Sequence, residues 1–439
     1  MIPIILTLFV PILGIVAILI NEFTYKFRIE LVTLITMLMT LTLFFIGLVV
    51  GFSNFNIQII RDISLSLSLG IYGINLPFIF ISILIPLFTL WPAYHEITRN
   101  KFWFYFLLMI IYTSLIGSFE SLNLLLFFIF WEIAIISVFI LIYLFLNENV
   151  RFNISIRFLI FTQVASLLVL VAFTMIFYNS GTFMLTDLIN MKLPYNTALI
   201  IVSLLTLAAM IKMPLFPLHV WLPDTYNFSP NSIVILLSGL FSKLGGFMLI
   251  VFVFNLFGYV FRSLHLLMWV GVISALYASF LALSQNRFKS IIIYSSIVYM
   301  SLAFTAIFAD NIIAIYGAVF LMVSYSLIST MLFFLSDIIN YKINDDNMNN
   351  THGLLSKMPK FSIFFIIGIL SSLGLPGFSN FIGELLVVIG LYLSSGYSLV
   401  ILISLIVATF YYLTLIKNLI FGGFNGNKKI LDVDGIEML

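Results

Sequence analysis

Four ionisable side chains lie deep within long apolar segments of this sequence, where charge is costly. Glu132 and Glu384 are acidic, and Lys212 and Lys243 are basic. A charged group at the centre of a lipid bilayer costs roughly 2.5–3.5 kcal/mol on insertion scales, so such residues mark ion or proton pathways by default. Burial and neighbouring charge change the proton affinity of a carboxyl or an amine, which allows it to take up and release protons. We therefore interpret these residues as candidate stations of a proton path.

Lys212 stands where an apolar run is interrupted, within the stretch MIKMPLFPLHVWLPD. Pro214 and Pro217 follow it, and a proline removes a backbone hydrogen bond and kinks or breaks a helix. Broken backbone at membrane depth is tolerated only where it is buried in protein or lines a wet cavity. A charge and a break in one place predict a functional site. His219 in the same stretch is a candidate proton relay, or alternatively bonds a carbonyl that the break leaves free.

Each of the four residues also has a structural interpretation. Either glutamate could be a carboxyl that is bonded to a neighbouring helix, and Lys212 could be a lysine that extends to a membrane surface. Lys243 precedes Gly245 and Gly246, which could simply be a close-packing site between helices. Three further acidic residues near the ends of apolar segments are expected to be interfacial: Glu120, Asp310 and Asp337.

The composition requires that these residues be positioned by a membrane bundle. Of 439 residues, 63% are hydrophobic and 8% are charged, whereas ordinary soluble domains are about 25% charged. The absence of cysteine excludes iron–sulfur ligation, disulfides and thiol catalysis within this sequence. The four histidines are far apart, so no metal-ligand spacing appears. Neither a basic run nor the net charge of +2 indicates nucleic-acid binding.

Thirteen segments approach the roughly 20 apolar residues that a membrane-spanning helix needs. They predict an all-α polytopic bundle with spans at 2–20, 31–51, 74–94, 102–119, 122–146, 156–179, 196–220, 228–256, 264–283, 289–309, 311–337, 361–393 (interrupted) and 397–421. The connection 52–73 alternates apolar and polar residues, which indicates a short strand pair or a surface segment. The connection 338–360 is the most polar and is expected to be mobile.

The distribution of basic residues predicts the orientation, because cytoplasmic loops carry an excess of lysine and arginine. Even-numbered loops hold only Arg61, Lys192 and Arg262. Odd-numbered loops and the tail hold Lys26, Arg28, Arg99, Lys101, Arg151, Arg157, Arg287, Lys289, Lys342, Lys357, Lys360, Lys417, Lys428 and Lys429. This bias places the N-terminus outside the cell and the C-terminus in the cytoplasm. The membrane is expected to be a cell's inner (plasma) membrane.

Two interrupted spans indicate internal symmetry. The seventh breaks after Lys212, and the twelfth breaks within LGLPGFSNFIGE, which ends at Glu384. The breaks are five spans apart, and an odd offset reverses orientation in the membrane, as in the inverted repeats of transporters. The expected divisions are an N-terminal three-span segment, two five-helix repeats and a cytoplasmic tail, at 1–102, 103–260, 261–421 and 422–439.

Several stretches closely resemble a known family. These are IKMPLFPLHVWLPDTYNFSP with SIVILLSGLFSKLGGFMLI, and also LNLLLFFIFWEIAIISVFILIYL, QNRFKSIIIYSSIVYMSLA and LGLPGFSNFIGELLVVIG. In this order, from about 103 to 393, they resemble the antiporter-like, proton-translocating membrane subunits of respiratory NADH–quinone oxidoreductase (complex I). Most branches carry lysine on the twelfth helix and the chain M branch carries glutamate, so Glu384 makes the sequence similar to chain M.

The resemblance implies roles for the four ionisable residues. Glu132 would be the fifth-helix glutamate paired with Lys212, Lys243 the central relay, and Glu384 the exit-side carboxyl. The chain itself would hold no cofactor, and quinone, iron–sulfur clusters and flavin or an equivalent would belong to partner subunits. Other antiporter-like and quinone-site subunits, with the lipid bilayer, would be its partners. A subunit of a multi-subunit cation/proton antiporter or of a membrane-bound hydrogenase is the alternative.

The sequence departs from the family pattern at two positions that usually carry histidine. Tyr299 stands in the tenth helix and Tyr325 in the eleventh. A tyrosine hydroxyl can join a hydrogen-bonded chain, although it is a poorer proton carrier than imidazole. Tyr226 likewise replaces a histidine after WLPD, and the usual fourteenth helix is missing. Tyr299 and Tyr325 are therefore candidate relay residues, or alternatively mark a structural subunit with a dead channel.

Overall fold

The computed structural model describes residues 2–24, 28–60, 64–189, 191–343, 345–348, 350–394, 396–423 and 432–433. Four basic residues that enter the orientation argument lie outside these ranges: Lys26, Arg61, Lys428 and Lys429. Most of the predicted tail 422–439 lies outside them as well.

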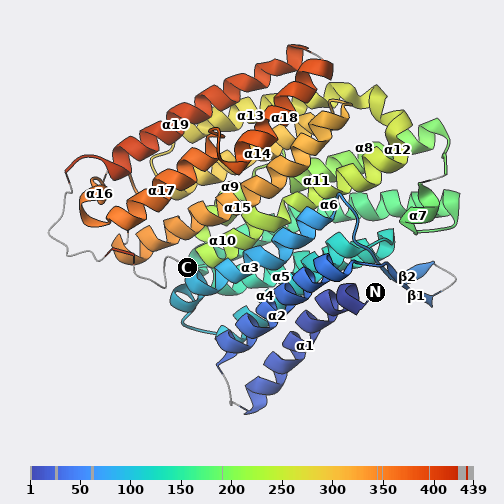
Figure 1. The fold of residues 1–439 in the computed structure, drawn as a ribbon, viewed down its shortest axis with the longest axis horizontal. Coiled ribbons are helices and arrows are strands. Elements are labelled where there is room, and N and C mark those ends of the chain that lie inside the picture. The colour runs from blue at the N-terminus through green and yellow to red at the C-terminus, as the bar shows by residue number, and fades with distance from the viewer. Residues whose placement is uncertain are drawn as a thin grey trace. The chain divides into compact units, whose positions relative to one another are not determined.

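Twelve helical segments among the described residues are long and apolar enough to cross a membrane. Those of the first part of the chain are α1 (Ile2–Thr24), α2 (Ile29–Val50), α3 (Leu76–Glu96), α4 (Lys101–Glu120), α5 (Leu124–Phe145), α6 (Glu148–Ser180) and α8 (Tyr195–Lys212). Next come a composite segment Asn231–Phe261, a segment ending in α13 (Met268–Leu283), α14 (Phe288–Ile307), α15 (Ile312–Ile343) and a segment ending in α19 (Leu402–Ile420). The prediction of a polytopic helical membrane protein is confirmed (Figure 1).

The interrupted twelfth span consists of two shorter helices, α17 (Pro359–Ser372) and α18 (Ser379–Ser394). The seventh span ends with α8, and no regular helix follows until α9 (Trp221–Phe228). Pro214 is the second residue after the end of α8 and has no N–H to continue the helix. Both breaks therefore occur where the prolines predict them.

The composite segment Asn231–Phe261 alternates between α-helical and π-helical turns. It comprises α10 (Asn231–Leu236), the π-helical Leu237–Phe241, α11 (Lys243–Met248), the π-helical Leu249–Phe254 and α12 (Asn255–Phe261). Wide turns of this kind inside an α-helix are frequent at functional sites. They flank Lys243 on both sides along the chain.

The chain divides into two compact units. The first contains Met1–Lys212 and Leu240–Ser263, and the second contains Met213–Gly239 and Leu264–Leu439. Within the first unit α4 packs against α1, α3 and α5, while α6 packs against α8. Within the second unit α14 is almost entirely buried and packs against α13, α15 and α9. The two inverted repeats remain a prediction.

Glycines allow α15 and α18 to approach closely in the second unit. A Cβ at Gly390 would lie 2.5 Å from the backbone nitrogen of Ala314, and one at Gly383 would lie 2.9 Å from the Cα of Leu321. Small residues that allow backbones to approach are a common device of membrane helix pairs. Because Gly383 precedes Glu384, this contact fixes the turn that carries the carboxyl.

The connection between α2 and α3 forms the predicted strand pair. Strands β1 (Phe55–Ile60) and β2 (Leu65–Leu69) are antiparallel, with Phe55 opposite Leu69 and Asn56 opposite Ser68. Leu69 also bridges Ser121, and the Gly70 N–H donates to the Glu120 carbonyl at 2.8 Å. The hairpin therefore covers the end of α4. A short helix, α7 (Leu185–Leu188), follows α6.

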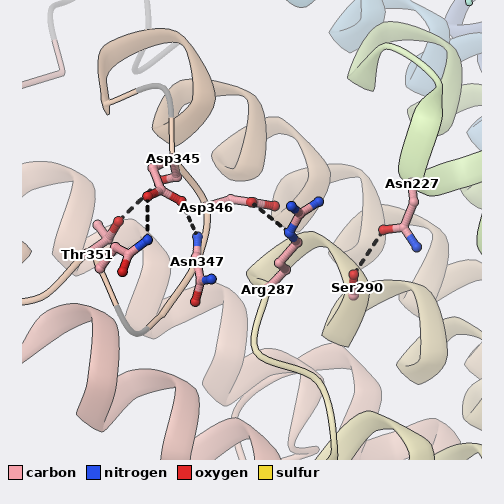
Figure 2. Close-up of polar contacts among 8 residues, drawn as sticks. Asn227, Arg287, Ser290, Asp345, Asp346, Asn347 and Thr351 are labelled. Carbon is pink, nitrogen blue, oxygen red and sulfur yellow. Dashed lines mark hydrogen bonds and ion pairs between the residues drawn. The ribbon is translucent and has the colours of Figure 1, made fainter.

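The polar connection 338–360 forms hydrogen bonds and an ion pair at its described residues, and its mobility remains a prediction. Helix α15 extends beyond the predicted end to Ile343, and a short helix α16 (Leu354–Lys357) precedes α17. Figure 2 shows Asp346 beside Arg287, with 3.9 Å between Oδ1 and Nε. The Asp345 carboxylate accepts the Asn347 N–H at 2.9 Å, which helps to hold the pKa of that carboxyl below its usual value.

Candidate proton-path site

Lys212 is the last residue of α8 and is fully buried. Its Nζ lies 3.2 Å from the centroid of the Phe241 ring and 4.6 Å from that of Trp131. It makes no hydrogen bond to any described residue. The electron-rich faces of aromatic rings attract a cation by about 2 kcal/mol when it is desolvated. Lys212 therefore lacks the charge-assisted hydrogen bonds to described residues that would fix an ammonium most strongly.

Glu132 lies beside Trp131 on α5 and is partly buried. Its Oε2 accepts a hydrogen bond from Gln163 Nε2 of α6 at 3.1 Å. It also interacts electrostatically with Lys212. Glu132 and Lys212 belong to one compact unit and interact without forming a hydrogen bond, so the pairing that the resemblance implies remains a prediction. Gln163 is a neighbour of Glu132 that the sequence argument missed. A polar amide in the middle of an apolar span was the available signal.

The indole of Trp131 connects this pair to the helix packing. Its Nε1 donates to Ser166 Oγ of α6 at 3.0 Å, and the side chain is fully buried. This bond fixes the ring that faces Lys212. The hydrogen bond also joins α5 to α6, so it helps to fix the part of α5 that carries Glu132.

Lys243 is fully buried in α11, in the same compact unit as Lys212. Helix α11 packs against α8, which carries Lys212. Gly245 and Gly246 are buried on the same short helix. Three of the four predicted stations therefore belong to the first unit.

Glu384 belongs to the second unit and lies on α18 just after the break. Its Oε1 accepts from Asn380 Nδ2 at 2.8 Å, and Ser324 Oγ donates to Asn380 Oδ1 at 3.0 Å. Gly374 in the break has φ +61°, and a Cβ there would collide with the Glu384 carboxyl. Only glycine suits this position, for both reasons.

Tyr299 and Tyr325 are completely buried, and their rings stack with centroids 4.2 Å apart. The Tyr299 hydroxyl donates to the Ser372 carbonyl, and Asn380 Nδ2 lies 3.3 Å from the same oxygen. The Tyr325 hydroxyl is 2.8 Å from Ser295 Oγ. Polar groups thus extend from α14 and α15 to the Asn380 that binds Glu384.

His219 lies in the segment between α8 and α9 and is 7% exposed. Its ring centroid is 5.3 Å from that of Tyr277 and 6.0 Å from that of Phe216. Its Nδ1 makes no hydrogen bond to a described residue, so the predicted carbonyl bond does not form at this atom. Its use as a relay remains a prediction.

Two acidic residues expected at the interface are buried. Glu120 is fully buried, and its Oε1 lies 2.8 Å from Thr7 Oγ1 of α1. Asp337 is 3% exposed and faces Asn231 Nδ2 at 3.3 Å. The chain after β2 covers the end of α4, and α10 packs against α15, so neither burying contact is local in the sequence. Asp310 is exposed. That these residues lie at the membrane interface stays a prediction.

Among the described residues, no group of three or more His, Cys, Asp or Glu side chains could hold a metal ion. The buried and partly buried ionisable groups described above are instead spread over several helices, α4, α5, α8, α11, α15 and α18. Such an arrangement is suited to binding and passing a proton.

Comparison with known proteins supplies a family. Residues 121–410 match the model for "NADH:quinone oxidoreductase/Mrp antiporter, TM". The chain is 36% identical over 346 residues to the chloroplast NAD(P)H-quinone oxidoreductase chain 4 of Adiantum capillus-veneris, a match that covers 77% of this chain and 69% of the relative. It is 29% identical over 433 residues to NADH-quinone oxidoreductase subunit M of Rickettsia prowazekii, a match that covers 95% of this chain and 88% of the relative.

Two solved structures share the fold. A chain of the respiratory complex I from Thermus thermophilus superposes with a TM-score of 0.91 at 24% identity, covering 99% of this chain and 92% of that one. A chain of the membrane-bound sulfane sulfur reductase, an archaeal respiratory membrane complex, superposes with a TM-score of 0.87 at 20% identity. The second match covers 98% of this chain and 90% of that one.

Proposed function

The chain belongs to the NADH:quinone oxidoreductase/Mrp antiporter transmembrane family, and from that membership we propose a residue-by-residue proton path. It is a proton-translocating membrane subunit of a quinone oxidoreductase complex. Glu132 and Lys212 form a pair whose charge state switches, Lys243 is the central relay, and Glu384 hands the proton towards the outside. NADH or a related donor reduces quinone in other subunits.

The observation that carries the proposal is the environment of Lys212. A fully buried ammonium needs hydrogen bonds or a counter-charge, and here it has two aromatic rings and an electrostatic interaction with Glu132. While Glu132 is ionised, it stabilises the charged lysine. When Glu132 is neutralised or turns to another partner, the lysine loses that support and releases its proton to the next acceptor.

Glu132 has a second neighbour that makes such switching reasonable. Gln163 offers an amide hydrogen to Oε2 at 3.1 Å, so the carboxylate keeps one hydrogen bond when its interaction with Lys212 weakens. Glu132 is also partly exposed on this chain. Ionisable groups on a membrane helix face protein or water and not lipid, so this side of α5 is expected to meet a neighbouring membrane subunit.

The cofactors of the reaction belong to the partner subunits in this proposal. Quinone, iron–sulfur clusters and flavin or an equivalent group would lie there, since this sequence contains no cysteine. The chain lies in a cell's inner membrane with its N-terminus outside, as the distribution of lysine and arginine supports.

The test is proton translocation by the complete complex in sealed membrane vesicles. We expect Glu132→Gln to abolish donor-driven acidification while the complex still assembles. Glu148→Gln is the matched control, because Glu148 is a highly exposed carboxyl at the start of α6. Normal pumping by Glu132→Gln would refute the proposal. Proton flux that requires sodium and ignores quinone reduction would instead indicate a cation/proton antiporter subunit.

A further inference from the structure

Four buried tyrosines gather in the second unit, two of which the sequence analysis did not single out. Tyr299 and Tyr325 lie on α14 and α15, while Tyr411 and Tyr412 lie on α19 with ring centroids 4.5 Å apart. All four are at most 2% exposed. We name these residues the tyrosine cluster.

The cluster faces the polar groups around Glu384. The Tyr412 hydroxyl faces those of Ser295, Ser372 and Tyr325, and Tyr299 and Tyr411 both interact electrostatically with Glu384. These groups come from α14, α15, α17, α18 and α19. The cluster is therefore the place where the helices next to the second break present their polar side chains to one another.

Three buried hydroxyls in this place form no hydrogen bond of good geometry with a described residue. They are those of Tyr411, Tyr412 and Ser372. A buried polar group without a hydrogen bond destabilises the folded state, and an ordered water molecule usually supplies the missing bond. Three such groups together indicate a place that binds water.

A mostly apolar groove adjoins the cluster at Tyr299. It has a volume of about 310 Å³, and its lining consists of Tyr299, Thr409 and the aliphatic residues Leu373, Leu402, Leu405, Ile406 and Ala408. About 10–15 Å³ of such volume suffices for one water molecule.

We propose that Tyr411 and Tyr412 bind a small cluster of water molecules that joins Tyr325 and Tyr299 to Glu384. The tyrosine cluster thereby forms a proton relay beside the second break. A hydroxyl both donates and accepts, so a proton that reaches one side of a water or hydroxyl oxygen displaces another from the opposite side. One O–H bond forms and one breaks at each step, no electron moves, and no tyrosine has to ionise.

This inference rests on the proposed function and adds to it a role for Tyr411 and Tyr412 of α19 in proton transfer. If the tyrosines only fill space, phenylalanine should replace them without effect, because the ring is retained and only the hydroxyl is lost. Tyr112→Phe is a matched control. Tyr112 is also fully buried and its hydroxyl also lacks a partner among the described residues, but it belongs to the first unit.

The experiment compares Tyr411→Phe, Tyr412→Phe and their double variant with Tyr112→Phe in vesicles that hold the complete complex. We expect proton pumping to fall on the order of tenfold in Tyr412→Phe and further in the double variant, because positioned proton-transfer groups contribute at least that much. Assembly and melting temperature should match those of Tyr112→Phe. Unchanged pumping in the double variant would overturn the proposal.

A high-resolution density map of the unmodified complex supplies an independent readout. We expect ordered water within hydrogen-bonding distance of the Tyr411 and Tyr412 hydroxyls, and its loss in Tyr412→Phe. A dry cluster in the unmodified complex would overturn the proposal even if the variants failed to assemble. Normal pumping by Glu132→Gln would instead refute the proposed function, so the two failures are distinguishable.

Discussion

Replacing Gly374 by alanine tests whether the position of the Glu384 carboxyl matters for proton transfer. The residue has φ +61°, and all three carboxyl atoms of Glu384 would lie less than 3.0 Å from the added Cβ. A left-handed backbone costs a non-glycine residue roughly 1–2 kcal/mol. Displacing the carboxyl also breaks its 2.8 Å hydrogen bond to Asn380, which costs about 1–3 kcal/mol. The total is on the order of 2–5 kcal/mol.

Gly377 provides a matched control in the same break. It has φ +103°, so alanine strains the backbone there too, but nothing lies within 4 Å of the added Cβ. We expect Gly377→Ala to lower the melting temperature of the complex and to pump protons nearly normally. Gly374→Ala should lower pumping at least tenfold, since a displacement of about 1 Å in a reacting group can cost a hundredfold.

The assay is donor-driven acidification of sealed vesicles, with quinone reduction measured in parallel. Combining Gly374→Ala with Glu384→Asp should restore part of the pumping, because the shorter side chain makes room for the new methyl group. Equal pumping by Gly374→Ala and Gly377→Ala would refute the argument that carboxyl position controls proton release.

Three further predictions concern Lys212 and the two ends of the polar connection after α15. Phe241→Leu removes the ring whose centroid lies 3.2 Å from Lys212 Nζ and should reduce proton pumping severalfold. Phe173 is also a buried ring of the first unit, and Phe173→Leu should leave pumping unchanged. Equal effects of the two substitutions in vesicles would count against the cation–π contact. Asp432→Ala removes the carboxylate that accepts hydrogen bonds from the Lys360 and Phe361 N–H groups at the start of α17. It should destabilise that turn by about 1 kcal/mol. Unchanged hydrogen-exchange protection of the turn would contradict the capping role. The Asn347 N–H and the Asn350 amide lower the folded pKa of Asp345, so its contribution to stability is complete above the unfolded value near 3.9 and is lost as the pH falls through the folded value. Hydrogen-exchange protection of residues 345–348 and 350–351 should therefore decline in that pH range in the unmodified protein but not in Asp345→Ala. Identical pH profiles of the two proteins would refute the assignment.

The fold was predictable because its main signals are local. Long apolar runs specify helices in lipid, where every backbone polar group must be satisfied within the segment. Prolines marked both breaks, and the alternation in 52–73 marked the hairpin that forms β1 and β2. The ends of the helices were predicted less accurately than their positions. Helix α15, for example, continues through polar residues beyond the apolar run and ends at Ile343.

The site was only partly predictable because much of it depends on contacts between distant segments. Glu132, Lys212 and Lys243 were conspicuous as charges in apolar runs, and the structure places them in one compact unit. The burial of Glu120 could not be predicted, because the residues after β2 that cover the end of α4 are distant in the sequence. Tyr411 and Tyr412 gave no signal, since tyrosine is common in apolar helices and only the packing of α19 reveals their unsatisfied hydroxyls.

A double-mutant comparison tests the central claim, that Glu132 and Lys212 act as one switch. Proton translocation is measured for Glu132→Gln, Lys212→Gln and the variant that carries both changes, in vesicles with the intact complex. If the two residues form one unit, the double variant pumps no worse than the more impaired single variant, because the second change removes nothing that is still working. Losses that multiply, or substantial pumping in either single variant, would contradict the account.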